Sequence, residues 1–281
     1  MKFEVSPINN MKPNFLKISK IIKENDNIKT FYFDYPLNAL PGQFIMLWVP
    51  GIDQKPFSIG FQDKNSFGLT IFKRGPLTEK LFELEAGDRV GISGPYGTSF
   101  AVNPDLHYIL VAGGYGAAPL GFLAKALNGK AKIDFLIGAR NSDLLLFEER
   151  LSLIPNTNLH IATDDGSKGH KGYVTDILQE ILDKLPADGQ NNGKSNILIA
   201  TCGPELMEKK ILDMSNKYGI ECAVSIERYM KCGIGICGQC AVDGPGICMC
   251  KEGPVVNKKI ANQITEFGKY HRNKSGQIVN L

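Results

Sequence analysis

Five of the chain's seven cysteines lie close together near the C-terminus, in a pattern that indicates a redox or metal centre. "KCGIGICGQC" holds Cys232, Cys237 and Cys240, and "ICMCKEG" adds Cys248 and Cys250. The first three follow a C-x4-C-x2-C spacing. This is the spacing of plant-type [2Fe–2S] sites, which take a fourth cysteine from further along the chain. Spacing leaves both Cys248 and Cys250 open as that fourth ligand.

Glycines separate the first three cysteines: Gly233, Gly235 and Gly238. A short loop around a cluster needs unusual backbone angles, which glycine adopts at little cost. Glycine also lets backbone amides approach the sulfurs, which tunes a cluster's potential. From about residue 224 the chain has few apolar side chains and no clear periodicity, so a bound centre would supply what its core lacks.

Zinc is the alternative to a cluster. Structural zinc sites use paired C-x2-C spacings, and Cys237 and Cys240 with Cys248 and Cys250 would make a four-thiolate set. That set leaves Cys232 unused and relies on a tight C-x-C chelate. The spacing therefore favours iron–sulfur over zinc.

Composition limits the classes of protein that need considering. The chain has 281 residues, which predicts two or three domains, with 43% hydrophobic and 22% charged residues. A net charge of +3 without a basic run among aromatics argues against nucleic-acid binding. No run of about 18 apolar residues and no signal peptide is found, so we expect a cytoplasmic protein, where disulfides are disfavoured.

Residues 1–102 predict an antiparallel barrel or sandwich. Six short segments rich in Ile, Phe, Val and Tyr are separated by turn residues. The predicted strands are 15–25, 28–36, 42–50, 55–63, 68–75 and 88–95. One helix is expected at 77–87, with Gly87 as its C-cap.

Residues 103–223 change to strands alternating with helices, which predicts an open parallel sheet covered on both faces. The predicted strands are 107–114, 132–140, 158–166 and 196–203. The predicted helices are 118–129, 143–154, 173–185 and 205–219. A polar surface loop is expected at 186–196, and residues 224–281 form the third, cysteine-bearing unit.

Two turns of this second unit suit a nucleotide. "VAGGYGAAPL" places Gly113, Gly114 and Gly116 between a strand and a helix, where a pyrophosphate can approach the helix N-terminus. Pro119 replaces the third glycine of the usual G-x-G-x-x-G, and a plain tight turn is the alternative.

The second turn, "IATCGPELM", ends a later strand at the same edge of the sheet, where ligands of such sheets bind. Cys202 there is either a small buried residue or the border of a nicotinamide ring.

Together these segments resemble the ferredoxin reductase family, which pairs an antiparallel FAD barrel with such a nucleotide domain. "QKPFSIG" matches its first flavin motif, with Lys55 where Arg is usual, and "TIFKRGPLTEKL" its second, with Leu77 where Gly is common. The resemblance implies FAD contacts at Lys55, Pro56, Phe57, Ser58, Phe72, Lys73, Gly75 and Thr78. It implies NAD contacts at Gly113, Gly114, Gly116, Cys202, Gly203, Pro204 and Glu205.

"SIERYMKCGIGICGQC" followed by "CKEGPVV" is similar to one narrower family, the electron-transfer subunits of type B dihydroorotate dehydrogenase. The resemblance implies cluster ligands at Cys232, Cys237, Cys240 and Cys250. It also implies a TIM-barrel partner with FMN, two copies of each subunit, and electron flow from FMN through [2Fe–2S] and FAD to NAD+ in pyrimidine biosynthesis. No catalytic acid–base residue is expected on this chain.

Two other interpretations stay open. One is an electron-transfer subunit of a sulfhydrogenase or of a ferredoxin–NADP oxidoreductase complex. One such group has Asp in place of the first cluster cysteine, so Cys232 counts against it. The other is a nucleotide-binding regulator with a structural zinc, which would leave both flavin motifs unexplained.

Overall fold

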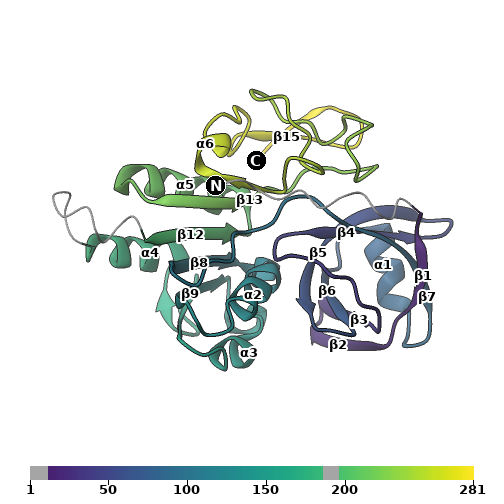
Figure 1. Cartoon of the computed structure of the whole chain (residues 1–281), viewed down its shortest axis with the longest axis horizontal. Helices are drawn as coiled ribbons and strands as arrows, with labels where there is room; N and C mark the ends of the chain where they lie inside the picture. The colour runs from purple at the N-terminus through teal and green to yellow at the C-terminus, as the bar shows by residue number, and fades with distance from the viewer. Residues whose placement is uncertain (1–11, 186–195) are drawn as a thin grey trace.

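The computed structural model describes residues 12–185 and 196–281. A curled antiparallel sheet and a parallel sheet with helices lie side by side, and the C-terminal segment lies across both (Figure 1). Among the described residues, no helix is both long and apolar enough to cross a membrane. The N-terminal residues 1–11 and nearly all of the predicted loop 186–196 fall outside the described ranges.

The first sheet has seven strands in the order β1-β7-β4-β5-β6-β3-β2, all paired antiparallel. Its strands are β1 (Asn14–Lys17), β2 (Lys20–Asn25), β3 (Ile28–Phe33), β4 (Phe44–Val49), β5 (Asp53–Gln62), β6 (Phe67–Phe72) and β7 (Arg89–Tyr96). Buried Phe, Ile and Leu side chains fill its interior, and helix α1 (Pro76–Glu83) contributes two more.

This sheet differs from its prediction at one place: segment 15–25 forms two strands, not one. The Ile18 amide donates to Asp88 O at 2.9 Å, beside β7, whereas the next amide, of Ser19, donates to Tyr32 O at 2.8 Å, on β3. The chain therefore passes between two edges of the curled sheet within two residues. The predicted helix 77–87 ends earlier, at Glu83, and Gly87 lies in the turn before β7 with φ +103°.

The second sheet has the order β11-β10-β9-β8-β12-β13-β14, parallel except for β14. Its strands are β8 (His107–Gly113), β9 (Lys132–Ala139), β10 (Thr157–Thr163), β11 (His170–Lys171), β12 (Ile197–Cys202), β13 (Glu221–Ser225) and β14 (Val255–Asn257). Alternating side chains of β8 enter two cores, one beneath α2 (Ala117–Ala126) and one beneath α4 (Val174–Asp183) and α5 (Glu205–Tyr218).

The predicted helix 143–154 is wrong in extent. A 3-10 turn, η2 (Ser142–Leu144), precedes the short helix α3 (Glu148–Ser152). Phe147 between them has φ +63°, outside the helical region, so the chain breaks there. Another short 3-10 turn, η1 (Gly114–Gly116), leads into α2.

The C-terminal segment joins both sheets instead of standing apart. Its strand β14 pairs antiparallel with β13. Neither of these two strands was predicted from the sequence. Just before β14, the Thr98 amide donates to Gly253 O at 2.7 Å and the Thr98 hydroxyl to Val255 O at 2.6 Å, next to β7. Helix α6 (Lys258–Ala261) and the hairpin of β15 (Tyr270–Arg272) and β16 (Ile278–Asn280) follow.

A buried carboxylate ties together three neighbouring strands where they begin. Asp134 on β9 is 8% exposed, and its oxygens lie 2.6 Å from His107 Nε2 and 3.0 Å from His160 Nε2. Asn158 Nδ2 donates to Asp134 at 3.2 Å. Burial raises the pKa of Asp134, but these hydrogen bonds outweigh it, and the pKa lies well below its usual range.

We expect Asp134→Asn to destabilise the protein at neutral pH by about 1–3 kcal/mol, because buried partners lose a charged acceptor. An unfolded Asp has a pKa of about 3.9. Because the folded pKa is lower, the carboxylate's contribution is present above about pH 4 and is lost as the pH falls toward the folded pKa. Urea unfolding from pH 7 to 3 should show the gap to wild type closing in acid. An exposed control, Asp105→Asn, should show no gap, and a pH-independent gap would contradict the expectation.

Candidate redox centre and nucleotide site

The cysteine loop between β13 and β14 is irregular backbone shaped by glycine. Gly233, Gly235 and Gly238 have φ of +74°, +81° and +68°. These left-handed angles turn backbone amides toward sulfur: Gly235 N donates to Cys250 Sγ at 3.1 Å, and Cys250 N to Cys240 Sγ at 3.3 Å. Such N–H···S bonds are the surroundings that an iron–sulfur cluster uses.

The thiols gather in two groups. Cys232 lies beside Cys237, and Cys240 lies beside both Cys250 and Cys248. In the described part of the chain, no three His, Cys, Asp or Glu side chains meet as ligands of a single metal ion. Thiols in two separate groups suit the two irons of a [2Fe–2S] cluster, whereas a structural zinc needs its four ligands around one point. The residues present therefore fit the cluster better than zinc.

Two of these thiols are made acidic by their neighbours. Burial opposes ionisation at Cys232, but backbone amides, among them Ile234 N at 3.5 Å, lower its pKa to about 7. Hydrogen bonds from the Cys250 side chain and from backbone amides, with the Cys248 side chain adding to them and burial opposing them, lower the pKa of Cys240 to about 6. The shared proton raises the pKa of Cys250. Thiolates are the form that binds metal.

Cys248 and Cys250 differ in their surroundings. Cys250 is 2% exposed and takes part in both N–H···S bonds of its pair. Cys248 is partly exposed, and its backbone amide is bound to Glu252 Oε2 at 3.0 Å. Burial and the nearby Cys240 and Glu252 raise the pKa of Cys248. Cys248 also lies close to Cys240, so Cys248 and Cys250 are both within reach of the Cys240 thiol.

The cysteine loop packs directly on the first sheet. A Cβ at Gly233 would lie 2.8 Å from Met46 Cγ on β4 and 3.3 Å from Tyr96 on β7. Met46, Tyr96, Cys240 and Cys250 belong to one continuous buried core. The predicted cluster ligands are thereby brought against the sheet that carries the predicted flavin motif.

The first flavin motif lies on β5, which packs against the nucleotide turn. A Cβ at Gly60 would lie 2.8 Å from Ala118 Cβ, at the start of α2. Pro56, Phe57 and Ser58 are partly exposed on this strand. Lys55 Nζ donates to Tyr229 Oη at 3.1 Å and pairs with Asp53 at 3.0 Å.

The second flavin segment forms the turn from β6 into α1. Thr78 Oγ1 accepts from Arg74 N and Gly75 N, at 2.8 and 3.0 Å, and donates to Gly75 O. Its hydroxyl therefore stabilises the turn before the helix. Lys73, which precedes this turn, is exposed. At the end of β6, Phe72 stacks on Tyr115 with ring centroids 6.0 Å apart.

The two predicted nucleotide turns lie in contact at the carboxyl edge of the second sheet. A Cβ at Gly116 would lie 2.1 Å from Cys202 O, and one at Gly113 would lie 2.5 Å from Pro204. A Cβ at Gly203 would come within 3.0 Å of Gly113 backbone atoms. Gly114 has open space around it and φ +54°. Three of these glycines are thus required by close packing, and the fourth by backbone angle.

Two predicted NAD contacts differ from the others: Glu205 is hydrogen-bonded within the protein, and Cys202 is buried. Glu205 Oε2 accepts from Arg228 Nη1 at 2.7 Å, and Glu205 Oε1 from Gly268 N at 2.9 Å. Cys202 is buried, and that burial raises the pKa of its thiol well above the usual range. Their role as NAD contacts stays a prediction.

Four residues at this site were not singled out from the sequence. They are Tyr115, Glu227, Arg228 and Tyr229. Tyr115 stacks on Phe72 and donates to Glu227, Arg228 donates to Glu205, and Tyr229 accepts from Lys55, so these side chains link the units that carry the motifs. All four lie inside the quoted stretches "GGYG" and "SIERYMKC", but none of them is one of the glycines or cysteines on which the predictions were based.

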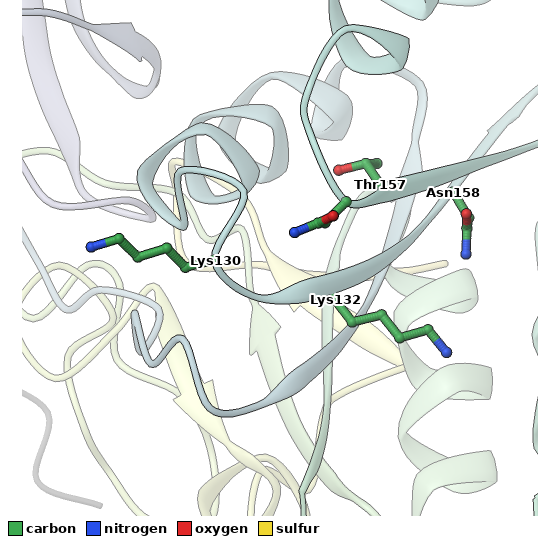
Figure 2. Close-up of a pocket in the computed structure, with 5 residues that line it drawn as sticks. Lys130, Lys132, Thr157 and Asn158 are labelled. Atoms are coloured by element: carbon green, nitrogen blue, oxygen red, sulfur yellow. The ribbon is translucent and has the colours of Figure 1, made fainter.

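A separate polar pocket lies at the opposite edge of the second sheet, where β9 and β10 begin. It is lined by Lys130, Lys132, Asn156, Thr157 and Asn158. Figure 2 shows the two lysine side chains extending in opposite directions, so they do not converge on one ligand. The pocket is far in the fold from the motif-bearing turns.

Two family models match parts of the chain. A family model described as the iron–sulfur cluster binding domain of dihydroorotate dehydrogenase B matches residues 227–260. A second, the oxidoreductase NAD-binding domain, matches residues 110–213.

Solved structures share the fold. A structure of an NADH-dependent reduced ferredoxin-NADP oxidoreductase aligns with a TM-score of 0.78 and 25% identity, covering 90% of this chain and 92% of that one. A ferredoxin NADP+ reductase from Neisseria gonorrhoeae with bound FAD and NADP aligns with a TM-score of 0.60 at 15% identity, over 74% of this chain and 92% of that one.

Curated relatives are closer in sequence. A protein of Methanocaldococcus jannaschii is 45% identical over 269 residues, 95% of this chain and 98% of the relative. One of Pyrococcus horikoshii is 42% identical over 257 residues, 91% and 94% of the two chains. Both are named "Probable dihydroorotate dehydrogenase B (NAD(+)), electron transfer subunit". With such identity over nearly its whole length, the chain belongs to the family of dihydroorotate dehydrogenase B electron transfer subunits.

Proposed function

We propose that this chain carries electrons between a dihydroorotate-oxidising partner and NAD+, using a [2Fe–2S] cluster and FAD. The observation that supports this most directly is the paired cysteine loop packed on β4 and β7 of the flavin-type sheet. A flavin accepts a hydride, with two electrons, and releases electrons singly, which suits a position between nicotinamide and a one-electron cluster.

Cys232, Cys237, Cys240 and Cys250 would hold the cluster. Their backbone N–H···S bonds would stabilise negative charge on the sulfurs, and the buried Cys240 and Cys250 would keep water from that side. Cys237 is exposed, and Ile236 beside it is 79% exposed. An exposed edge of this kind would let electrons enter from a bound partner.

The FAD would lie along β5 and the β6–α1 turn. Pro56, Phe57 and Ser58 are partly exposed for contact with the ring system, and Phe72 offers an exposed face. Lys73, Gly75 and Thr78 shape the turn where the pyrophosphate would meet the N-terminus of α1. Lys55 would supply a positive charge nearby.

NAD would bind where the two turns meet, with its pyrophosphate at Gly114 and Gly116 before α2. Cys202, Gly203 and Pro204 would border the nicotinamide. Because β5 packs on the start of α2, the flavin and nicotinamide motifs are brought next to each other, as hydride transfer requires.

The partner would be an FMN-containing TIM-barrel subunit that oxidises dihydroorotate to orotate, with two copies of each chain in the complex. The relatives' names imply a catalytic partner subunit, and the exposed cluster edge is suited to one. Electrons would then pass from FMN through the cluster to FAD and NAD+.

A second candidate is an electron-transfer subunit of a ferredoxin–NADP oxidoreductase complex, which the alignment at a TM-score of 0.78 favours. The two differ in partner, and therefore in the substrate that reduces the complex. The names of the curated relatives support the first candidate.

The absorption spectrum of anaerobically purified chain tests the proposal. We expect flavin bands with a broad shoulder, both bleached by NADH. Dihydroorotate should bleach them only after the co-expressed FMN subunit is added. A colourless protein that contains zinc would contradict the cofactor assignment, and reduction by ferredoxin but not by dihydroorotate would favour the second candidate.

The fourth ligand can be identified by comparing Cys250→Ser with Cys248→Ser. We expect the former to lower iron and acid-labile sulfide by about tenfold or more, since even outer-shell changes cost that much. Cys248→Ser serves as the matched control and should keep its cluster. Cluster loss in Cys248→Ser alone would overturn the assignment.

A further inference from the structure

Three consecutive residues ahead of the cysteine loop each contact a different part of the molecule. Glu227 accepts a long hydrogen bond from Tyr115 Oη at 3.5 Å, on the nucleotide turn. Tyr229 accepts from Lys55 Nζ at 3.1 Å, on β5. Between them, Arg228 turns toward α5 and the C-terminal segment. The stretch 227–229 is therefore the place where the three units meet.

Arg228 is the buried member of the three. Its side chain is 3% exposed, and it forms a fork with Glu205, with Nη1–Oε2 at 2.7 Å and Nη2–Oε1 at 3.2 Å. Its Nε donates to Glu266 Oε1 at 2.6 Å. Nη1 also donates to Glu227 O at 2.7 Å. A planar guanidinium held at this many points fixes the angles between the segments that it joins.

The contacts continue to the cysteine loop. Glu266 Oε2 accepts from Asp243 N at 3.1 Å and from Arg272 Nη1 at 3.3 Å. Asp243 lies three residues after Cys240. At the other end, Glu205 directly follows Gly203 and Pro204 of the nucleotide turn. One network of charged hydrogen bonds thus runs from the nucleotide turn to the loop that carries the thiols.

We propose that Arg228 is a positioning residue for electron transfer: its fork fixes the cysteine loop relative to the nucleotide turn, and Tyr229 next to it joins the same stretch to β5 of the flavin-type sheet. This inference rests on the proposed function. Arg228 touches neither reacting group. Because its bonds hold the base of the cysteine loop and not the contact between β5 and α2, we expect its loss to affect the one-electron step between flavin and cluster and to leave the hydride step between NADH and flavin in place.

The conservative change Arg228→Lys is the most informative variant. Lysine keeps the charge but cannot make the fork, so the buried charge is retained while the angular constraint is lost. We expect cluster reduction to slow by about tenfold, since misplacement by about an ångström can cost up to about a hundredfold. FAD and iron content should stay at wild-type levels.

The chain offers a matched control. Arg150 forms a similar fork with Glu24, at 3.1 and 3.2 Å, between α3 and β2. Arg150→Lys removes a fork between the first and second units, away from the cysteine loop. It should leave both transfer steps and the cluster spectrum unchanged.

The experiment is anaerobic stopped-flow reduction by NADH, followed at separate flavin and cluster wavelengths. A second readout is the EPR spectrum of each protein after chemical reduction, which reports the cluster's surroundings without turnover. Slowed cluster reduction and shifted EPR lines in Arg228→Lys, with an unchanged flavin step, support the inference. Equal rates and spectra in the variant and wild type, or equal slowing of both steps, overturn it.

If Arg228→Lys binds no cluster, Glu266→Gln is judged by the same criteria, because it keeps the side chain's shape and removes its charge. The result also separates two failures. Wild-type protein whose flavin is not reduced by NADH contradicts the proposed function. If the wild-type protein carries out both transfer steps and the variant behaves identically, only the role of Arg228 is contradicted.

Discussion

The arrangement of the nucleotide unit, the cysteine loop and the C-terminal tail depends on one buried guanidinium. A charge with 3% exposure is tolerated only when partners replace the water it has lost. Arg228 finds those partners on α5, on its own strand exit and in the C-terminal segment, so these three must converge wherever Arg228 is buried. This gives the tail beyond residue 262 a structural role, since Glu266 and the Gly268 amide complete the network.

A second junction lies only a few residues from the cysteines. In "CKEGPVV", Cys250 faces its thiol pair, Gly253 and Val255 accept hydrogen bonds from Thr98, and β14 then extends the second sheet. The stretch therefore fixes a cysteine, the first sheet and the second sheet within seven residues. This explains in physical terms why so short a segment is informative: each of its positions meets a different requirement.

Local patterns predicted most of the fold. Runs of Ile, Val and Phe located all seven strands described in the first sheet, two of them as a single segment, and the alternation of strands with helices located the principal elements of the second. What local patterns missed depends on partners distant in sequence. The passage from Ile18 to Ser19 between two edges is set by Asp88 and Tyr32, and β14 is set by its pairing with β13.

The same limit applies to the site. Cysteine spacing and glycine turns are local signals. The structure brings the cysteines close to one another, and it brings the two glycine turns into contact with each other. Glu205 follows a nucleotide motif in sequence, yet its carboxylate lies against Arg228, 23 residues away. Nothing in the local sequence distinguishes a carboxylate that meets a ligand from one that meets a buried arginine. That distinction needs the tertiary structure.

The order of the units in space differs from their order along the chain, and this matters for electron flow. The cysteine loop comes last in sequence but packs on Met46 and Tyr96 of the first sheet. In the proposed function, one-electron transfer takes place where the loop meets that sheet, and the hydride step takes place near the contact of β5 with α2. Since residues 227–229 contact β5, the nucleotide turn and α5, this one stretch can hold both geometries at once.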